Sequence, residues 1–136
     1  MNSISFDEAV KKIVERDDRF DVRAYSFLNA ALDWTVRRIA EQKTERENSH
    51  VSGQELLQGF CDFSIDQFGP MAYTVLDEWG IHTGINVGEM VFLLIEEEVF
   101  SKQDGDSLAD FRCKSLKKIL TEPFEVSDEE VGLSTK

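Results

Sequence analysis

Residues 52–70, SGQELLQGFCDFSIDQFGP, predict a helix whose two ends are both marked in the sequence. Ser52 and Glu55 form a capping box, in which the side chain of each residue accepts a hydrogen bond from the backbone N–H of the other. Gly69 and Pro70 end the helix, because glycine favours the position after the last turn and proline cannot continue a helix. Its inner side carries Leu56, Leu57, Phe60, Cys61, Ser64, Ile65 and Phe68.

Two more helices are predicted after this one. Apolar residues at helical spacing run from Met71 to Trp79, and Gly80 closes that helix. Residues 85–100 also have a helical pattern but are apolar on nearly every side, which is typical of a central helix enclosed by others. A buried strand over residues 90–95 is the competing interpretation of so short an apolar run. The flanking glutamates and the length of the segment favour a helix.

Two helices are also predicted upstream. A capping box that starts at Ser5 predicts a helix over residues 6–15. Asp21 is a suitable N-cap for a long second helix. Phe27 and Trp34, seven residues apart, widen the apolar surface of this helix. We therefore expect it to pack against more than one neighbour.

The remaining segments are predicted to be loops and one further helix. Residues 41–51, EQKTERENSHV, are polar up to Val51 and predict a surface loop. Asp106 or Ser107 caps a short helix that runs through Phe111. The sequence alone does not decide whether this helix extends to Leu120.

These elements predict one domain of the all-α class. At 136 residues the chain has the usual size of a single domain. We expect residues 1–120 to form a single-domain bundle of five to six helices around the central apolar helix. Residues 121–136 are acidic and have few apolar anchors, so we expect a flexible tail.

The charge balance restricts the partners. The chain has 27 Asp and Glu residues against 15 Lys and Arg, for a net charge of -12 at pH 7. Nucleic acids and anionic membranes are bound by cations, so we expect neither as a partner. The N-terminal residues lack the basic start and apolar run of a signal peptide. No stretch approaches the about 18 apolar residues of a membrane span. We therefore expect a cytoplasmic protein.

Motifs for catalysis, metals and cofactors are missing from the sequence. Cys61 and Cys113 match no CxxC or zinc spacing and are expected to be free thiols, with Cys61 inert in the core. His50 and His82 are the only histidines, and neither belongs to an HExxH motif. Phosphate-binding glycine loops and the GxSxG motif are also absent. We therefore expect no catalytic residue, no metal and no cofactor.

One cluster of residue types is nevertheless typical of a binding pocket. Trp79, His82 and Glu89 gather around one predicted turn between helices, and Tyr25 or His50 are further contributors. Pockets commonly form between helices, so a small-ligand-binding protein or an enzyme is the alternative function. The competing interpretation of His82 is a surface residue that bonds carbonyl groups at a helix end.

Several blocks of the sequence resemble an uncharacterised bacterial family of planctomycete and verrucomicrobial lineages. The blocks are HVSGQELL (50–57), QFGPMA (67–72), EWGI (78–81) and GEMVF (88–92). The resemblance spans residues 6–112. That family continues with a Gly-Tyr-Asp-Phe-like segment where this chain has Arg-Cys-Lys-Ser, so we expect the C-terminal part to pack differently. The resemblance implies a bacterial cytosolic protein and transfers no activity, because the family has none established.

The leading hypothesis is a helical protein-interaction or regulatory domain without catalytic activity. Its basis is an acidic surface, ten phenylalanines and the absence of catalytic motifs. It predicts an exposed apolar patch, since large patches mark partner sites. The expected partner is a protein, either another chain or a second copy in a homodimer.

Overall fold

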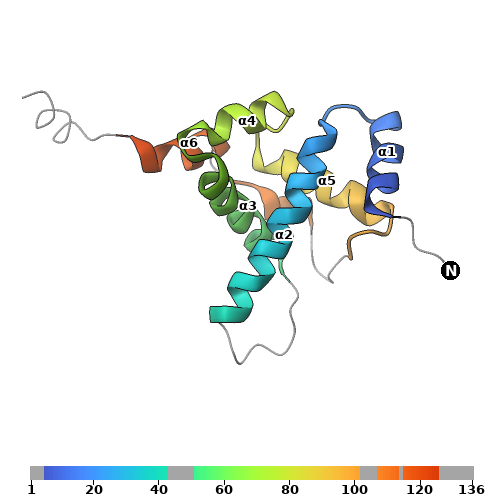
Figure 1. The fold of residues 1–136 in the computed structure, drawn as a ribbon, viewed down its shortest axis with the longest axis horizontal. Coiled ribbons are helices and arrows are strands. Elements are labelled where there is room, and N and C mark those ends of the chain that lie inside the picture. The colour runs from blue at the N-terminus through green and yellow to red at the C-terminus, as the bar shows by residue number, and fades with distance from the viewer. Residues whose placement is uncertain (1–4, 43–50, 102–106, 114, 126–136) are drawn as a thin grey trace, which may run out of the picture.

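The computed structural model describes residues 5–42, 51–101, 107–113 and 115–125, and all its regular elements are helices (Figure 1). The α-helices are α1 (Phe6–Arg16), α2 (Val22–Gln42), α3 (Gly53–Phe68), α4 (Ala72–Glu78), α5 (Gly84–Glu96) and α6 (Leu116–Thr121). Three short 3-10 helices are η1 (Gly69–Met71), η2 (Leu108–Phe111) and η3 (Glu122–Phe124). The all-α class is confirmed, and residues 90–95 lie within α5 rather than in a strand.

The predicted helix starts and ends depend on local hydrogen bonds that the structure contains. Glu55 N donates to Ser52 Oγ at 3.1 Å, and Ser52 N donates to Glu55 Oε1 at 3.0 Å. At the other end of α3, Gly69 has a φ of 55°, a left-handed value that favours glycine. Pro70 lies in η1, so the fourth helix begins at Ala72, after a 3-10 turn.

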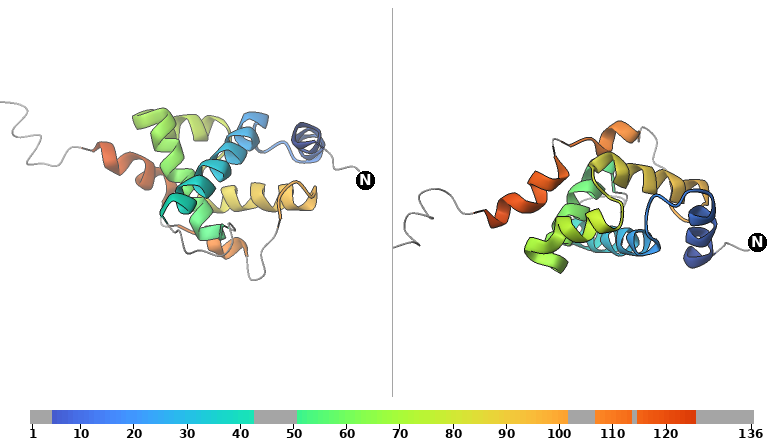
Figure 2. Two further views of the ribbon diagram at one scale, coloured as in Figure 1. Left: turned by 60° about the horizontal axis from the view of Figure 1, so that its bottom comes forward. Right: turned by 90° about the horizontal axis from the view of Figure 1, so that it is seen from above.

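Helix α5 is the most enclosed of the longer helices. Its residues from Gly84 to Ile95 are all buried or half-buried. In Figure 2, α2 and α4 lie on one side of the molecule, and α5 and η2 lie on the other. Helix η2 packs on the side of α5 that carries Gly84 and Gly88. The ring of Phe111 in η2 contacts Gly88. The absence of Cβ atoms on these glycines permits this close contact.

Helix α5 ends at Glu96, four residues before the predicted end at Phe100. Val99 N donates to Leu94 O at 3.1 Å, and Glu98 N donates to Ile95 O at 2.9 Å. These two bonds form a Schellman motif, which stops a helix by placing one residue in the left-handed conformation. Glu98 takes that position, with a φ of 64°. The prediction failed because glycine, the usual signal for this stop, is absent here.

We expect the substitution Glu98→Gly to stabilise the domain by about 0.5–1 kcal/mol, because glycine adopts a positive φ without steric cost. Urea unfolding measures the change. Glu98→Gln is the matched control, since it removes the charge near the end of α5 and leaves the backbone strain. A gain for glycine no larger than that for glutamine would show that the left-handed conformation costs nothing here.

The C-terminal part contains two short helices instead of the extended one left open from the sequence. Helix η2 ends at Phe111, and Arg112 has extended backbone angles. Ser115 then starts α6 with its own cap, as its Oγ accepts a hydrogen bond from Lys118 N at 3.2 Å. The break allows Phe111 to pack on α5 while α6 packs on α4. Residues 43–50 of the predicted loop and residues 126–136 of the predicted tail lie outside the described residues.

Among the described residues, no helix is both long enough and apolar enough to span a bilayer.

Candidate functional site

Five half-buried aromatic side chains form a continuous row where α2, α3 and the end of α4 meet. We call this row the aromatic face; in order, it consists of Trp34, Phe63, Phe27, Phe68 and Trp79. Successive ring centroids are 4.9–5.9 Å apart, within the range of favourable aromatic pairs. Each of the five residues keeps part of its surface exposed, and Phe27, Phe63, Phe68 and Trp79 also pack against the buried core. The row therefore lies at the edge of the core and is partly open to solvent.

Three helical segments position the aromatic face. Phe27 and Trp34 are two turns apart on α2, so they lie on the same side of that helix. Phe27 also contacts the fully buried Phe60 at 5.6 Å between centroids, which connects the row to the core. Trp79 follows α4, and its carbonyl oxygen accepts a hydrogen bond from Asp21 N at 3.0 Å. This bond joins the end of α4 to the start of α2.

An arginine lies at each end of the aromatic face. The guanidinium carbon of Arg38 is 4.6 Å from the ring centroid of Trp34, and that of Arg23 is 5.9 Å from Trp79. Both distances are typical of cation–π contacts. Arg23 is held by Asp21 at 2.9 Å, and the hydrogen bond from its side chain lowers the pKa of Asp21 to about 2. The charge of each arginine is thus matched by an aspartate, since Arg38 pairs with Asp62.

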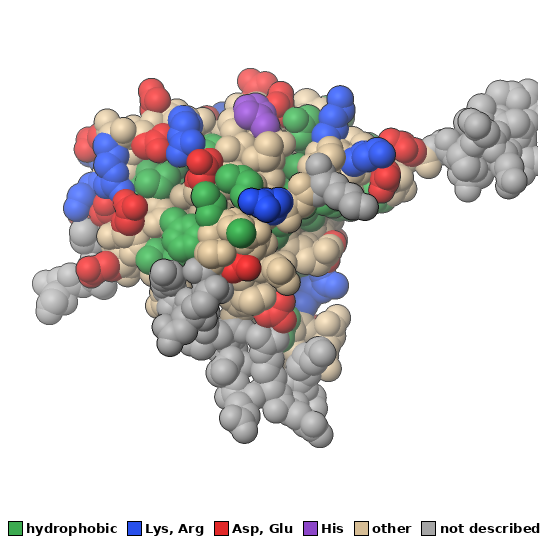
Figure 3. Space-filling view, turned by 180° about the vertical axis from the view of Figure 1, so that it is seen from behind, with side chains coloured by type: hydrophobic (Ala, Val, Ile, Leu, Met, Phe, Trp, Pro, Cys, Tyr) green, Lys and Arg blue, Asp and Glu red, His purple; other side chains and the backbone are tan. Residues whose placement is uncertain are grey.

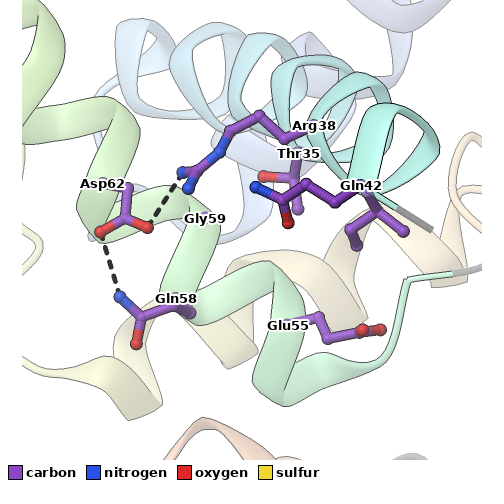
Figure 4. Close-up of a pocket in the computed structure, with 8 residues that line it drawn as sticks. Thr35, Arg38, Gln42, Glu55, Gln58, Gly59 and Asp62 are labelled. Carbon is purple, nitrogen blue, oxygen red and sulfur yellow. Dashed lines mark hydrogen bonds and ion pairs between the residues drawn. The ribbon is translucent and has the colours of Figure 1, made fainter.

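Beyond Arg38, the aromatic face adjoins a polar hollow between α2 and α3, with a volume of about 170 Å³ (Figure 4). Arg38 Nη1 donates to one oxygen of Asp62 at 3.0 Å, and Gln58 Nε2 donates to the other at 3.0 Å. Both carboxylate oxygens are therefore engaged. The lining residues are Thr35, Arg38, Ile39 and Gln42 of α2, and Glu55, Gln58, Gly59 and Asp62 of α3.

Gly59 sets the distance between α2 and α3 beneath this hollow. A Cβ atom at Gly59 would lie 1.9 Å from Thr35 Oγ1, far inside van der Waals contact. Thr35 is buried, and its hydroxyl donates to Ala31 O at 2.7 Å. The two helices cross this closely only because residue 59 has no side chain.

The residues singled out from the sequence lie in separate surroundings. Tyr25 is fully buried in the core, where burial raises the pKa of its hydroxyl to about 12. Its oxygen has no hydrogen-bond partner within the part of the chain that the structure describes. Trp79 belongs to the aromatic face. His50 lies outside the described residues.

His82 and Glu89 lie on the other side of the turn that follows α4. The ring of His82 is exposed, and its Nδ1 is 2.6 Å from Asp77 Oδ1. Glu89 accepts hydrogen bonds from Asn86 Nδ2 at 3.0 Å and pairs with Arg19 Nη1 at 3.2 Å. His82 and Glu89 therefore contact different residues.

Glu89 also lines an open groove beside α5, with a volume of about 500 Å³. The other lining residues are Arg19, Phe92, Leu93, Glu96, Ser107 and Leu108. Figure 3 shows the side of the molecule opposite to Figure 1, where hydrophobic side chains lie among acidic and basic ones. None of its lining residues belongs to the aromatic face, and most of them are on α5 and η2, which lie on the other side of the molecule from α2 (Figure 2).

Four members of the aromatic face stand out in the sequence, but the sequence does not join them. Phe27 and Trp34 were assigned to one helix and Trp79 to a pocket, whereas Phe68 was counted with the inner side of its helix. Phe63 was not singled out. The seven-residue spacing of Phe27 and Trp34 was the one local signal, and their contacts with α3 could not be read from spacing.

Within the described ranges of the chain, no cluster of three or more His, Cys, Asp or Glu side chains could hold a metal ion. Burial raises the pKa of the Cys61 thiol to about 12, so it stays protonated at neutral pH. A buried protonated thiol is a poor nucleophile.

Comparison with known proteins does not extend this picture, and the resemblance to a bacterial family remains a prediction. The chain matches no protein-family model, no curated protein and no solved structure.

Proposed function

We propose that this chain is a helical protein-binding domain without catalytic activity, and that the aromatic face holds its partner. The observation that carries this proposal is the row of five partly exposed rings with an arginine at each end. Single exposed apolar residues are common on any protein, but a continuous row is not. Interface cores are enriched in aromatic residues and arginine, and Trp and Arg dominate their binding energy.

Trp34 is the residue expected to contribute most. Its ring contacts Phe63 and the guanidinium group of Arg38 at one end of the row, next to the polar hollow. Covering the exposed part of an aromatic ring removes apolar surface from water, which favours association by about 25 cal/mol per Å². The pairing of apolar rings with satisfied polar groups at the rim is the usual arrangement of a protein interface.

We place this function in the cytoplasm. Cys61 and Cys113 are free thiols, and Cys61 is sealed in the core. Free thiols suit a reducing compartment. The partner is a protein, either another chain or a second copy.

The alternative proposal, a small-ligand pocket near Trp79, His82 and Glu89, has weaker support. Trp79 contributes to the aromatic face, His82 is exposed, and Glu89 is held by Arg19 and Asn86 in the groove beside α5. A pocket that combines the three would need their side chains to face one cavity.

Photo-crosslinking tests the proposed surface. A photoreactive amino acid at position 34 is expected to give a crosslinked adduct of defined mass in cells that naturally produce the protein. Leu108 is the matched control position, because it is 40% exposed and belongs to η2, which lies on the other side of the molecule from α2 (Figure 2). Trp34→Ala is expected to weaken binding of the crosslinked partner by about 2 kcal/mol, or roughly 30-fold in Kd. Equal crosslinking at positions 34 and 108 would reject the aromatic face as the binding surface.

A further inference from the structure

The lysines and arginines of the chain are unevenly distributed. Between Arg46 and Lys102 the sequence contains no Lys or Arg. This stretch includes all of α3, α4 and α5, so these helices contribute carboxylates and no side chain of fixed positive charge to the surface. The net charge of -12 is therefore concentrated on this part of the fold.

Several of these carboxylates border the aromatic face. Asp62 precedes Phe63, and its pairing with Arg38 places it beside Trp34. Asp66 is exposed, one turn after Phe63 on α3, and it accepts a hydrogen bond from the neutral amide of Gln67.

The end of α4 adds a second acidic border. Glu78 is exposed, directly precedes Trp79 and acts electrostatically on Arg23, which lies over the Trp79 ring. This carboxylate lies at the opposite end of the aromatic face from Asp62.

The cations on the α2 side are already neutralised. Arg23 is paired with Asp21 at 2.9 Å, and Arg37 is paired with Asp33 at 2.9 Å. Arg38 forms an ion pair with Asp62. The surface around the five rings therefore has excess negative charge. The positions of Arg23 and Arg38 also show that guanidinium groups fit over these indole rings.

We propose, on the basis of the binding function above, that the partner of the aromatic face is a basic amphipathic helix. Its apolar residues lie on the rings, and its Lys and Arg side chains lie against the carboxylates of α3 and α4. An apolar helix face laid on an apolar surface is a common mode of peptide recognition. Opposite charge adds orientation and speeds association. A second copy of this chain fits less well, because each copy brings a charge of -12.

Intrinsic fluorescence provides a direct test, since both tryptophans of the chain, Trp34 and Trp79, belong to the aromatic face. The whole chain is titrated with two helical peptides that lack tryptophan. Both have the same leucine pattern, but one carries lysines and the other carries glutamates on its polar side. We expect the lysine peptide to shift the fluorescence and to bind about 100-fold more tightly than the glutamate peptide. Its affinity should fall as salt rises, because salt screens exposed charges.

Two pairs of substitutions test where the charge acts. Asp66→Asn with Glu78→Gln is expected to weaken the lysine peptide about 5- to 10-fold. Asp7→Asn with Glu15→Gln is the matched control, because it removes two exposed carboxylates from α1 and should leave the affinity unchanged. Equal weakening by both pairs would overturn the proposed site, since it would indicate a general charge effect.

The remaining outcomes separate this inference from the proposed function. Tight binding of the glutamate peptide that is lost in Trp34→Ala would overturn the basic partner and leave the binding surface in place. Binding of the lysine peptide that Trp34→Ala does not weaken, measured by calorimetry, would overturn both. A dimer in sedimentation that Trp34→Ala dissociates, with no binding of either peptide, would replace the basic helix by a second copy.

Discussion

Replacing Gly80 by alanine is expected to destabilise the domain by about 3 kcal/mol, from backbone strain and a steric clash of comparable size. Gly80 has a φ of 95°, which L-residues rarely adopt. A Cβ atom there would also lie 2.3 Å from the carbonyl oxygen of Arg19. Because this neighbour is backbone, it cannot rotate away. Urea unfolding measures the loss, which corresponds to a decrease in Tm of about 10 °C for a domain of this size.

Gly69→Ala is the matched control for Gly80→Ala. Gly69 also has a positive φ, 55°, but a Cβ atom there would meet no other atom within 4 Å. The control therefore measures backbone strain alone, and we expect about half the loss. If the two substitutions destabilise equally, the contact between Gly80 and the Arg19 carbonyl group has no energetic importance.

The Gly80 substitution also affects the aromatic face. Gly80 follows Trp79, whose carbonyl oxygen is bonded to Asp21 N at the start of α2. Pushing residue 80 away from Arg19 would move Trp79 relative to Phe27. Variants that remain folded should therefore bind the partner more weakly than the wild-type protein.

Replacing Gly59 by alanine is expected to destabilise the domain by about 2–3 kcal/mol. At an ordinary helical position the same change would stabilise the helix by about 1 kcal/mol. The sign of the change in the free energy of unfolding, measured in urea, therefore tests the prediction. The added Cβ atom would lie 1.9 Å from Thr35 Oγ1 and 2.7 Å from Thr35 Cγ2. Thr35 is held by its hydrogen bond to Ala31 O, and its branched side chain has few alternative rotamers. The helices must therefore separate.

A double-mutant cycle with Thr35→Ala checks the cause. Alanine at position 35 removes the two closest atoms and leaves its own Cβ atom 2.8 Å from the added group. We expect Gly59→Ala to cost at least about 1 kcal/mol less in this background than in the wild-type protein. Additive effects of the two substitutions would contradict a direct clash between α2 and α3.

Most of the helices could be predicted from the sequence because their ends depend on residues a few positions apart. The capping boxes at Ser5 and Ser52 and the stop at Gly69 have both partners within one turn. Two boundaries could not be predicted. Glu98 ends α5 through local hydrogen bonds but without the glycine that usually signals such a stop. The break between Phe111 and Ser115, which the sequence left open, allows Phe111 to pack on α5.

The sequence by itself determined the all-α class, the main helices and the excess of negative charge, because these follow from local spacing and composition. Only the tertiary structure decided which side chains form the candidate site. Phe27 meets Phe63 and Phe68, and Arg38 meets Asp62, across the crossing of α2 and α3. Helical periodicity shows that one side of a helix is apolar, but it does not show which neighbour covers that side or how completely. The close approach of α2 and α3 at Gly59 determines which helix covers the apolar side and how much of it stays exposed.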